Sequence, residues 1–474
     1  MTGAATRVVV IGGGIAGLAA AYELGHRLPA AEILLLEGAR QIGGKLRVAE
    51  LAGHPVDVGA EAMLVRRPEG IALARAVGLG EELISPLTTS AEVMAGGARH
   101  RLPTGTMMGI PGDVAAIRAT GILSDDALRQ VEAEPFANKL APFAKDVSVA
   151  SLVRQRLGEE VLDRLVEPLL GGVYAGRAEH LSVAATMGGL WAHLHRHGGS
   201  LVEAAQALAP PREPGTATQP VFTSIEGGLG RLASTVAERG RFEVRTSVTV
   251  RSIQRTATGF QLECGPVPAT ELIDASAVVI ALPPVKAAIV LDRLSRPASR
   301  ELTAIETASM AIVSLAFDRV SPPSSSGLLI GAREGFATKA ITLSSQKWPG
   351  APAGLTLLRA SIGRVGETSD LHRDDADLTD LVVGELDPLL GIRARPVDAL
   401  VTRWGGALPQ YDVGHLERVA RIRAAVATVP GLAVCGATYD GIGIPACIAS
   451  ARRAVQSVLD AIDARTAASG LSPS

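Results

Sequence analysis

The glycine motif near the amino terminus constrains the fold of this chain more than any other feature. An apolar run that is typical of a buried strand ends at Ile11, and glycines follow it at the spacing Gly-x-Gly-x-x-Gly. An alanine-rich helix is expected from Leu18 to Leu24, and the next apolar strand, 32–36, leads directly into Glu37. This order is typical of a βαβ unit that binds a dinucleotide, with the acid accepting hydrogen bonds from the adenosine ribose.

Each glycine of the motif has a separate physical role. Gly12 permits the sharp turn after the strand, and Gly14 lets the backbone approach a pyrophosphate that a side chain would block. Gly17 lets the helix pack closely on the strand. The amides at the start of the helix, those of Ile15 and Ala16, carry partial positive charge and are suited to receive the phosphates.

A second group of glycines follows the acid directly. Together with the segment Asp57-Val58-Gly59-Ala60-Glu61, it resembles the FAD-binding amine oxidase and phytoene desaturase superfamily. In that superfamily the glycines bring the backbone near the flavin phosphates, an arginine lies beside the nucleotide, and the later segment passes the isoalloxazine ring. The resemblance implies an FAD cofactor, and the residues implied to bind it in these two segments are Gly38, Arg40, Gly43, Gly44, Lys45, Leu46, Gly59, Ala60 and Glu61.

The composition limits the classes of function. With 474 residues, 47% of them hydrophobic, the chain is long enough for two or three lobes with a large core. A net charge of −2 gives no indication of nucleic-acid binding, and three well-separated cysteines favour a reducing compartment. No uninterrupted apolar window is long enough to span a membrane, and the glycine spacing disfavours a secretion signal, so a cytoplasmic location is expected.

No metal site is expected from the sequence. His193, His195 and His197 alternate along the chain, but no cysteine or carboxylate completes a ligand set beside them. We interpret these histidines as a solvated helix face or loop.

The order of predicted elements divides the chain into three lobes. Strand, glycine turn and helix recur in three separate parts of the chain, which predicts a discontinuous α/β, Rossmann-like domain that binds FAD. Between them lie a mainly helical insert and a substrate lobe built on an antiparallel sheet. The expected boundaries are 1–90, 221–299 and 400–466 for the FAD-binding domain, 91–220 for the insert with a linker at 210–220, 300–399 for the substrate lobe, and 467–474 for a tail.

Three further elements are predicted from their patterns. Residues 242–250 alternate between polar and apolar side chains, as a half-buried strand does. Residues 277–282 are wholly apolar and are stopped by prolines, which predicts a strand in a buried sheet. A final helix is expected from Ile448 to Ala464.

Three later segments resemble one family within the superfamily, the oxygen-dependent protoporphyrinogen and coproporphyrinogen oxidases. They are residues 167–176, the Arg403-Trp404 pair with the Ala-Leu-Pro-Gln-Tyr run and His415 after it, and the glycine-rich loop at 436–448. The likeness extends over essentially the whole chain and is loosest at 92–146. It implies that the substrate is bound by Gly171, Tyr174 and Tyr411, and that FAD is also bound by Val248, Trp404, Gly436, Ile442, Gly443 and Ile444.

One position departs from the superfamily pattern. An aspartate that binds near the ribityl chain often follows the glycine that corresponds to Gly436, and this chain has Ala437 there. The change removes one polar contact to the flavin. The backbone amides of Gly443 and Ile444 are therefore the expected partners.

The resemblance implies a six-electron oxidation of a porphyrinogen to a porphyrin by repeated hydride transfer to the flavin N5. Oxygen then reoxidises the flavin and is reduced to H2O2. Because the cofactor carries out the difficult chemistry, no catalytic side chain is expected. The substrate propionates need cationic anchors, preferably arginines. Arg66 and Arg67 are the first candidates, and Lys339, Lys347 and Arg359 are weaker ones.

The resemblance favours coproporphyrinogen III as substrate, with protoporphyrinogen IX as the alternative. A second alternative is another member of the superfamily, an amine oxidase or a carotenoid desaturase, although aromatic residues make up only 3% of the chain and supply an amine cage poorly. A third is a flavin-bound interaction protein without activity. Flavin attachment is expected to be non-covalent.

Two interactions with further components are also candidates. A ferrochelatase that takes up the product is one candidate partner. Met107, Met108, Ile110 and Pro111 are candidates for an edge that touches a membrane peripherally. The same residues are equally suited to a lid over the pocket or to buried core.

Overall fold

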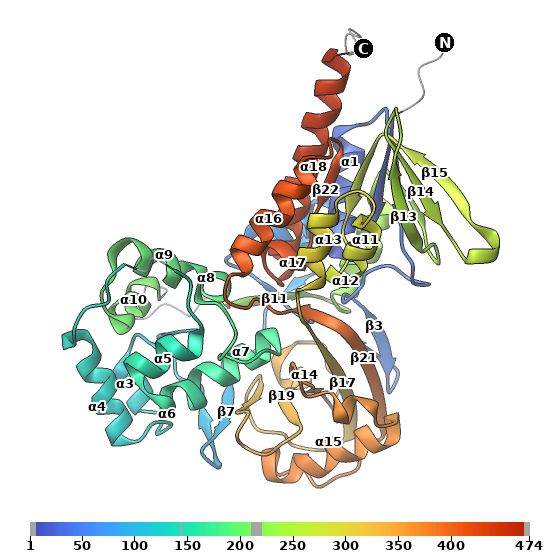
Figure 1. Ribbon diagram of the computed structural model, residues 1–474. Coiled ribbons are helices and arrows are strands. Elements are labelled where there is room, and N and C mark those ends of the chain that lie inside the picture. The colour runs from blue at the N-terminus through green and yellow to red at the C-terminus, as the bar shows by residue number, and fades with distance from the viewer. Residues whose placement is uncertain (1–5, 143–144, 210–219, 469–474) are drawn as a thin grey trace.

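The computed structural model describes residues 6–142, 145–209 and 220–468. Residues 210–219 of the expected linker and 469–474 of the expected tail lie outside the described residues. Figure 1 shows three bodies: a domain at the top of the view that contains α1 and α18, a helical lobe at the lower left, and a sheet-based lobe at the bottom. We call them the Rossmann-like domain, the helical lobe and the sheet lobe.

A five-stranded parallel sheet forms the centre of the Rossmann-like domain. Its strand order is β12-β2-β1-β16-β22, and every neighbouring pair is parallel. The carboxyl ends of all five strands therefore meet at one edge, where ligands bind in folds of this class. The strands are β1 (Arg7–Ile11), β2 (Glu32–Leu36), β12 (Glu243–Arg245), β16 (Ala277–Ile280) and β22 (Leu432–Val434).

Both faces of this sheet are covered, which explains why its central strands are apolar without alternation. Val8 and Val10 of β1 belong to one core cluster, and Val9 and Ile11 belong to the cluster on the opposite face. The first face packs against α1 (Ile15–Arg27), α11 (Gly230–Arg239) and α18 (Ile444–Ala468). The second packs against β13 (Val250–Arg255), β14 (Phe260–Cys264), β15 (Glu271–Ala275), α12 (Pro284–Leu291), α13 (Arg296–Thr303) and α16 (His415–Ala427).

Short elements complete this domain and lead from it to the other two. A hairpin follows β2, and a small antiparallel sheet has the order β5-β11-β6. The elements are β3 (Val48–Leu51), β4 (His54–Asp57), β5 (Met63–Leu64), α2 (Pro68–Ala76), η1 (Gly80–Glu82), β6 (Leu83–Ile84), β11 (Phe222–Ile225), η4 (Val267–Ala269) and α17 (Ala437–Asp440).

The helical lobe has a core of its own, formed mainly by aliphatic side chains of its short helices. Side-chain caps start several of the helices; the Ser148 hydroxyl, for example, accepts a hydrogen bond of 3.2 Å from the Ser151 amide. The elements are β9 (Thr106–Met107), β10 (Ile110–Pro111), α3 (Val114–Arg118), α4 (Asp125–Ala133), η2 (Glu134–Phe136), α5 (Val149–Leu157), α6 (Glu159–Val161), the π-helix η3 (Leu162–Val166), α7 (Glu167–Tyr174), α8 (Val183–Thr186), α9 (Gly188–His197) and α10 (Leu201–Leu208).

A seven-stranded sheet of order β21-β17-β20-β19-β18-β7-β8 forms the sheet lobe. All its neighbouring pairs are antiparallel except β18 and β7. One face is apolar and is covered by α15 (Asp375–Leu390). The remaining elements are β7 (Glu92–Ala95), β8 (Ala98–Arg101), β17 (Thr307–Asp318), β18 (Gly327–Ile330), β19 (Thr338–Thr342), α14 (Ser344–Lys347), β20 (Leu355–Ile362), η5 (Ser369–His372) and β21 (Asp398–Pro409).

The strand pairing differs from the expected lobe boundaries in two places. Residues 92–101, expected in the helical insert, form two strands at the edge of the sheet lobe. Residues 400–409, which begin the last expected part of the FAD-binding domain, belong to β21 (Asp398–Pro409) and pair with β17. Both segments pair with strands far away in the sequence, and such pairing leaves no local pattern for sequence analysis to detect.

Two predicted elements have different limits in the structure. The alternating run 242–250 is not one strand: residues 243–245 join the parallel sheet and a separate strand begins at Val250. Ser247 between them has φ of 59°, a left-handed conformation that breaks an extended chain. The last helix is longer than expected and runs from Ile444 to Ala468.

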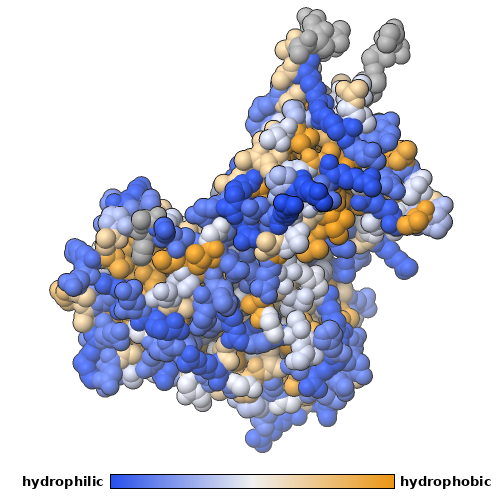
Figure 2. Space-filling view, viewed as in Figure 1, coloured by the Kyte–Doolittle hydropathy of each residue, from blue (hydrophilic) through white to orange (hydrophobic). Residues whose placement is uncertain are grey.

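Hydrophobic surface is gathered in a few areas. Figure 2 shows them over the helical lobe and over the Rossmann-like domain. In the latter domain, Val285 and Ile289 of α12 are 49% and 57% exposed. The positive mean hydropathy of +0.26 reflects the many alanines and the large buried cores. Across the described residues, no helix combines the length and the apolar character needed to cross a bilayer.

Candidate functional site

The glycine turn has the geometry that its spacing predicts. Gly12 has φ of 106°, and a side chain there would press on the Ala281 carbonyl oxygen at 2.7 Å. A Cβ on Gly17 would overlap the Gly12 carbonyl oxygen, so only glycine allows the helix to lie this close to the turn. At Gly14, in contrast, no atom of the described residues around it lies within 4 Å of the position a Cβ would take. The turn therefore has open space at the start of α1, where a phosphate fits.

Glu37 is held at the end of β2 by two backbone amides. Its carboxylate accepts hydrogen bonds from the Gly13 amide at 2.6 Å and from the Ala39 amide at 2.7 Å. The Val248 amide donates to the Glu37 carbonyl oxygen at 2.9 Å. The acid is thus fixed beside the glycine turn, as a ribose-binding carboxylate must be.

The second glycine pair packs directly on the first. The Gly43 amide donates to the Gly13 carbonyl oxygen at 2.8 Å, and a Cβ on Gly44 would lie 3.2 Å from the Gly14 Cα. Gly43 and Gly44 both have positive φ, of 102° and 58°. Arg40 is exposed just before the pair. Two segments that were predicted separately to lie near the phosphates therefore form one surface.

The next segment continues this surface toward the sheet lobe. The Lys45 carbonyl oxygen accepts a hydrogen bond from the Ala60 amide at 2.9 Å, and a Cβ on Gly59 would overlap that oxygen. The Trp404 indole of β21 donates to the Val58 carbonyl oxygen at 2.8 Å. Leu46 is buried. Trp404 therefore joins the candidate cofactor segment to the sheet lobe.

The glycine-rich loop near the carboxyl terminus meets the amino-terminal turn. Gly436 has φ of 121°, and a Cβ there would lie 3.7 Å from the Ala16 Cβ. The chain then passes Ile442 and Gly443 to Ile444, the first residue of α18. Another helix start, whose first amides have no partner within the helix, thus lies in the same region.

Two tyrosines predicted at the substrate site support this loop from the other side. Tyr174 and Tyr411 have ring centroids 5.7 Å apart, and the Tyr411 hydroxyl donates to the Ala437 carbonyl oxygen. The His415 ring stacks on Tyr411 at 4.2 Å, and its Nε2 lies 3.0 Å from the Thr438 carbonyl oxygen. Burial raises the pKa of Tyr174 to about 12 and lowers the pKa of His415 to about 4, so both are neutral at pH 7.

Replacing Tyr411 with phenylalanine is expected to loosen the loop at 437–444. The change keeps the packing but leaves the Ala437 carbonyl oxygen without its hydrogen bond from the buried Tyr411, which costs about 1–3 kcal/mol. Urea unfolding and the flavin content of the purified protein measure this effect. Tyr22→Phe is a matched control because the Tyr22 hydroxyl makes a long, exposed hydrogen bond of 3.4 Å. Equal effects of the two changes would contradict the role assigned to Tyr411.

Glu61 links the Rossmann-like domain to the sheet lobe. Its carboxylate pairs with Lys347 at 2.5 Å and with Arg359 at 2.7 Å, and all three side chains are at most 15% exposed. Arg359 also donates to the Gly59 carbonyl oxygen at 2.5 Å. The two cations hold the pKa of Glu61 at about 2 despite its burial. Two of the weaker candidate anchors, Lys347 and Arg359, therefore already form ion pairs with Glu61.

The first candidate anchors lie just before α2. Arg66 is exposed, and Arg67 pairs with Glu69 at 2.7 Å. Gly171 lies on α7, and among the described residues outside its own helix the atom nearest to a Cβ position there is Arg364 Nε at 4.0 Å. The structure thus brings Tyr174 and Tyr411 together and gives Gly171 a cationic neighbour that the sequence analysis did not single out.

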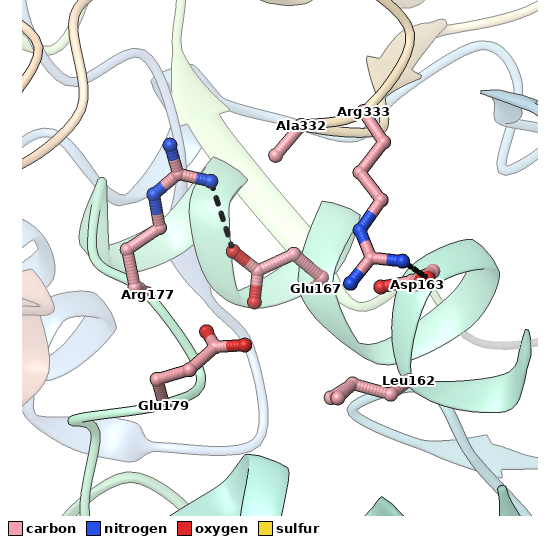
Figure 3. Close-up of a pocket in the computed structure, with 7 residues that line it drawn as sticks. All are labelled: Leu162, Asp163, Glu167, Arg177, Glu179, Ala332 and Arg333. Atoms are coloured by element: carbon pink, nitrogen blue, oxygen red, sulfur yellow. Dashed lines mark ion pairs between the residues drawn. The ribbon is translucent and has the colours of Figure 1, made fainter. Parts of the chain in front are cut away.

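A small charged cavity lies beside α7. Figure 3 shows Arg177 and Arg333 directed at the carboxylates of Glu167 and Asp163, with separations of 4.0 Å and 2.7 Å. Its volume of about 40 Å³ has room for only a few water molecules. The cavity is too small for a cofactor or a tetrapyrrole, and its two arginines face three carboxylates, those of Asp163, Glu167 and Glu179.

Metal ligation has no support within the parts of the chain that the structure describes. No group of three or more histidine, cysteine or carboxylate side chains there is arranged to hold a metal ion. His193, His195 and His197 lie on α9, and the rings of His193 and His197 contact each other at 5.2 Å.

The partners that these residues contact in the folded chain were not identified from the sequence, because those partners are far away along the chain. The ion pairs of Glu61 join positions almost 300 residues apart, and no local motif marks them. Arg364 follows β20 without any pattern that would identify it as buried. The glycine segments were found because their spacing is local.

The assembled residues fit a dinucleotide cofactor. The open space at Gly14, the fixed carboxylate of Glu37 and the second glycine pair provide a phosphate cradle and a ribose acceptor on one continuous surface. Lys45, Ala60 and Trp404 extend that surface to the sheet lobe.

Comparison with known proteins identifies the family. The model of the flavin-containing amine oxidoreductases matches residues 15–459. A coproporphyrinogen III oxidase of Mycobacterium tuberculosis is 37% identical over 97% of this chain and 98% of its own, and that of Bacillus subtilis is 32% identical over 95% and 97%. A solved structure from Exiguobacterium, assigned as a protoporphyrinogen oxidase, has a TM-score of 0.86 at 30% identity and covers 97% of this chain and 99% of its own.

These matches confirm the predicted α/β, Rossmann-like fold and the FAD cofactor. The chain is an FAD-dependent oxidoreductase that belongs to the flavin-containing amine oxidoreductase family, in the branch that contains the coproporphyrinogen III oxidases.

Proposed function

We propose that this protein oxidises coproporphyrinogen III to coproporphyrin III in haem biosynthesis, with oxygen as the electron acceptor. The reaction removes six electrons and six hydrogens from the substrate, and three molecules of O2 take them up as three of H2O2. The observation that carries the proposal is the identity of 37% over nearly the full length of a coproporphyrinogen III oxidase.

In this reaction the chain's own residues position and shield the cofactor and the substrate. When bound, FAD supplies the hydride acceptor. The backbone at Gly14 and Gly44 holds its phosphates, Glu37 holds the adenosine ribose, and the Gly443 and Ile444 amides lie at the start of α18. Tyr411 secures the loop that precedes these amides. No side-chain acid or base is required.

Flavin attachment is non-covalent in this proposal. Cys435 and Cys447 are the cysteines nearest the glycine-rich loop, and both are buried. Burial raises the pKa of the Cys447 thiol to about 11 and raises the pKa of Cys435 further. Neither thiol is ionised at neutral pH, so neither is a ready nucleophile.

Arg66 and Arg67 remain the proposed outer anchors for the propionates. Arg66 is exposed to solvent, and the ion pair of Arg67 with Glu69 is partly exposed, with the Arg67 side chain 42% accessible. Because Glu69 accepts two hydrogen bonds from Arg67, a propionate would meet Arg66 first.

Turnover of coproporphyrinogen III and protoporphyrinogen IX by the purified, yellow protein tests the proposal. Porphyrin fluorescence gives both rates under aerobic conditions. We expect a kcat/KM for the tetracarboxylate at least about tenfold higher than for the dicarboxylate, equivalent to about 1.4 kcal/mol of transition-state stabilisation. The reverse preference would contradict the assignment to coproporphyrinogen and favour protoporphyrinogen IX as the substrate.

The same assay separates porphyrinogen oxidation from the remaining candidate functions. An amine oxidase or a carotenoid desaturase would oxidise neither tetrapyrrole, and a flavin-bound interaction protein would oxidise no substrate at all. A ferrochelatase stays a candidate recipient of the product.

The segment considered as a membrane edge lies against the core of the helical lobe. Ile110 is fully buried there, and Met107 and Met108 pack against the same core. These positions favour the interpretation of that segment as core over its interpretation as a membrane edge.

A further inference from the structure

Two cations that belong to none of the motifs lie buried in the sheet lobe. Lys339 belongs to β19, at a bulge where the pairing with β20 shifts by one residue, and Arg364 follows β20. The two residues are only 1% and 4% exposed. Burial, with a smaller contribution from the charge of the nearby Arg364, lowers the pKa of Lys339 to about 7.

Lys339 has no partner for its charge among the residues that the structure describes. Its Nζ is buried and makes no hydrogen bond. A buried ammonium group without a partner is destabilising, and buried lysines are normally paired. A methionine would fill a similar volume without this penalty, so the amino group needs a function outside the folding of the chain.

The two carboxylates whose charges act on Arg364, those of Glu167 and Glu385, are already engaged elsewhere; Glu167 accepts a hydrogen bond from the Ala178 amide at 3.0 Å. Glu385 of α15 accepts hydrogen bonds from the Ala337 and Thr338 amides at 2.7 and 3.0 Å. Arg364 donates to the Ile330 carbonyl oxygen at 3.2 Å and reaches the exposed Glu367 only at 3.6 Å. Arg364, and Lys339 whenever it is protonated, therefore carry positive charge in the interior that these neighbours do not fully compensate.

Arg364 lies beside a position already implicated in substrate binding, Gly171 of α7. α7 contacts β18 and β19, and Gly171 is the α7 residue next to Arg364. Outside the helix itself, the described atom nearest to a Cβ on Gly171 is Arg364 Nε, at 4.0 Å. The missing side chain thus leaves room directly beside the guanidinium.

We infer that Lys339 and Arg364, with the space at Gly171, form a buried subsite for one carboxylate of the tetrapyrrole. The inference rests on the proposed function and adds an inner anchor to the outer arginines. A propionate carboxylate would accept charge-assisted hydrogen bonds from Lys339 Nζ and from the guanidinium, and it would supply the negative charge that this interior lacks. The subsite would then select substrates that carry a carboxylate at this depth.

The test compares Lys339→Met with the matched control Lys286→Met, which removes an exposed lysine from α12. The ligands are coproporphyrin III, whose binding is measured by quenching of protein fluorescence, and its uncharged tetramethyl ester. We expect Lys339→Met to weaken binding of the free acid about 10- to 100-fold, to leave binding of the ester unchanged, and to raise the melting temperature. Lys339→Arg should recover most of the affinity for the acid, and the control should change the binding of neither ligand.

A second variant tests the space without touching either cation. Gly171→Val puts two methyl groups beside Arg364 and is expected to weaken binding of the free acid more than that of the ester. Unchanged affinity of Lys339→Met for the acid, or equal losses for acid and ester, would overturn the inference. Turnover of coproporphyrinogen III by the wild type is a separate readout: its absence would refute the proposed function, whereas its presence with an unaffected Lys339→Met would refute only the subsite.

Discussion

Gly14→Val is expected to remove FAD binding while leaving the fold intact. Among the described residues around it, no atom lies within 4 Å of a Cβ at this position, so the valine meets no protein atom at its first carbon and occupies the space that the phosphates need. Losing even two charge-assisted amide contacts corresponds to about 3 kcal/mol, so we expect the dissociation constant for FAD to rise at least about 100-fold. Flavin absorbance after purification and titration of the apoprotein with FAD measure the change.

Gly17→Val is the variant to compare with Gly14→Val. A Cβ at position 17 would overlap the Gly12 carbonyl oxygen, so this variant should lose stability as well as flavin. Circular dichroism and thermal unfolding of the apoproteins separate the two cases. A Gly14→Val protein that retains stoichiometric FAD would show that the pyrophosphate does not lie at this turn.

Glu61→Gln is expected to destabilise the protein by about 3–5 kcal/mol, because it leaves two buried cations, Lys347 and Arg359, without their counter-charge. The pKa of Glu61 is lowered from 4.5 to about 2 in the folded protein. The ionised carboxylate therefore contributes stability fully above pH 4.5, and this contribution is lost as the pH falls from 4.5 toward 2. Urea unfolding at pH 7 and at about pH 3, inside this window, measures both effects.

The matched control is Glu301→Gln, which breaks an ion pair with the largely exposed Arg421. Because solvent screens that pair, the control should change stability little. The difference between wild type and Glu61→Gln should also narrow in the acidic measurement. A constant difference across this pH range would contradict the assignment of the stabilisation to the charge of Glu61.

Those parts of the site that depend on residues close together in the chain were predictable from the sequence. Gly12, Gly14 and Gly17 were predictable with their roles because a sharp turn, an open approach and a close helix contact each demand glycine at a fixed spacing. The carboxylate of Glu37 followed from its place after an apolar strand. The structure adds the hydrogen bond to the Gly13 amide that fixes it.

Long-range pairing explains what the sequence could not provide. β7 lies beside β18, more than two hundred residues further along the chain, and its parallel pairing has no signal in either segment. Glu61 meets Arg359 for the same reason only in the folded protein. Lys339 was recognisable as a candidate anchor by its charge, but its burial and its neighbour Arg364 depend on how α7 packs on the sheet lobe.

The arginine anchors illustrate a second limit. Arg66 and Arg67 were selected because they follow the segment that passes the flavin ring, and the structure places them at the start of α2 with Arg67 paired to Glu69. Their closeness in sequence to that segment identified the region in which substrate anchors are expected. Which cations are free to accept a propionate is decided by the ion pairs that each one makes, and these depend on the complete fold.

Anaerobic mixing of the FAD-loaded protein with coproporphyrinogen III tests the central claim most directly. If the flavin accepts hydride from this substrate, its visible absorbance will bleach within the mixing experiment, and admitting oxygen will restore the absorbance with release of porphyrin fluorescence and H2O2. Flavin that stays oxidised with both coproporphyrinogen III and protoporphyrinogen IX, in a protein that retains its full FAD content, would contradict the assignment to porphyrinogen oxidation.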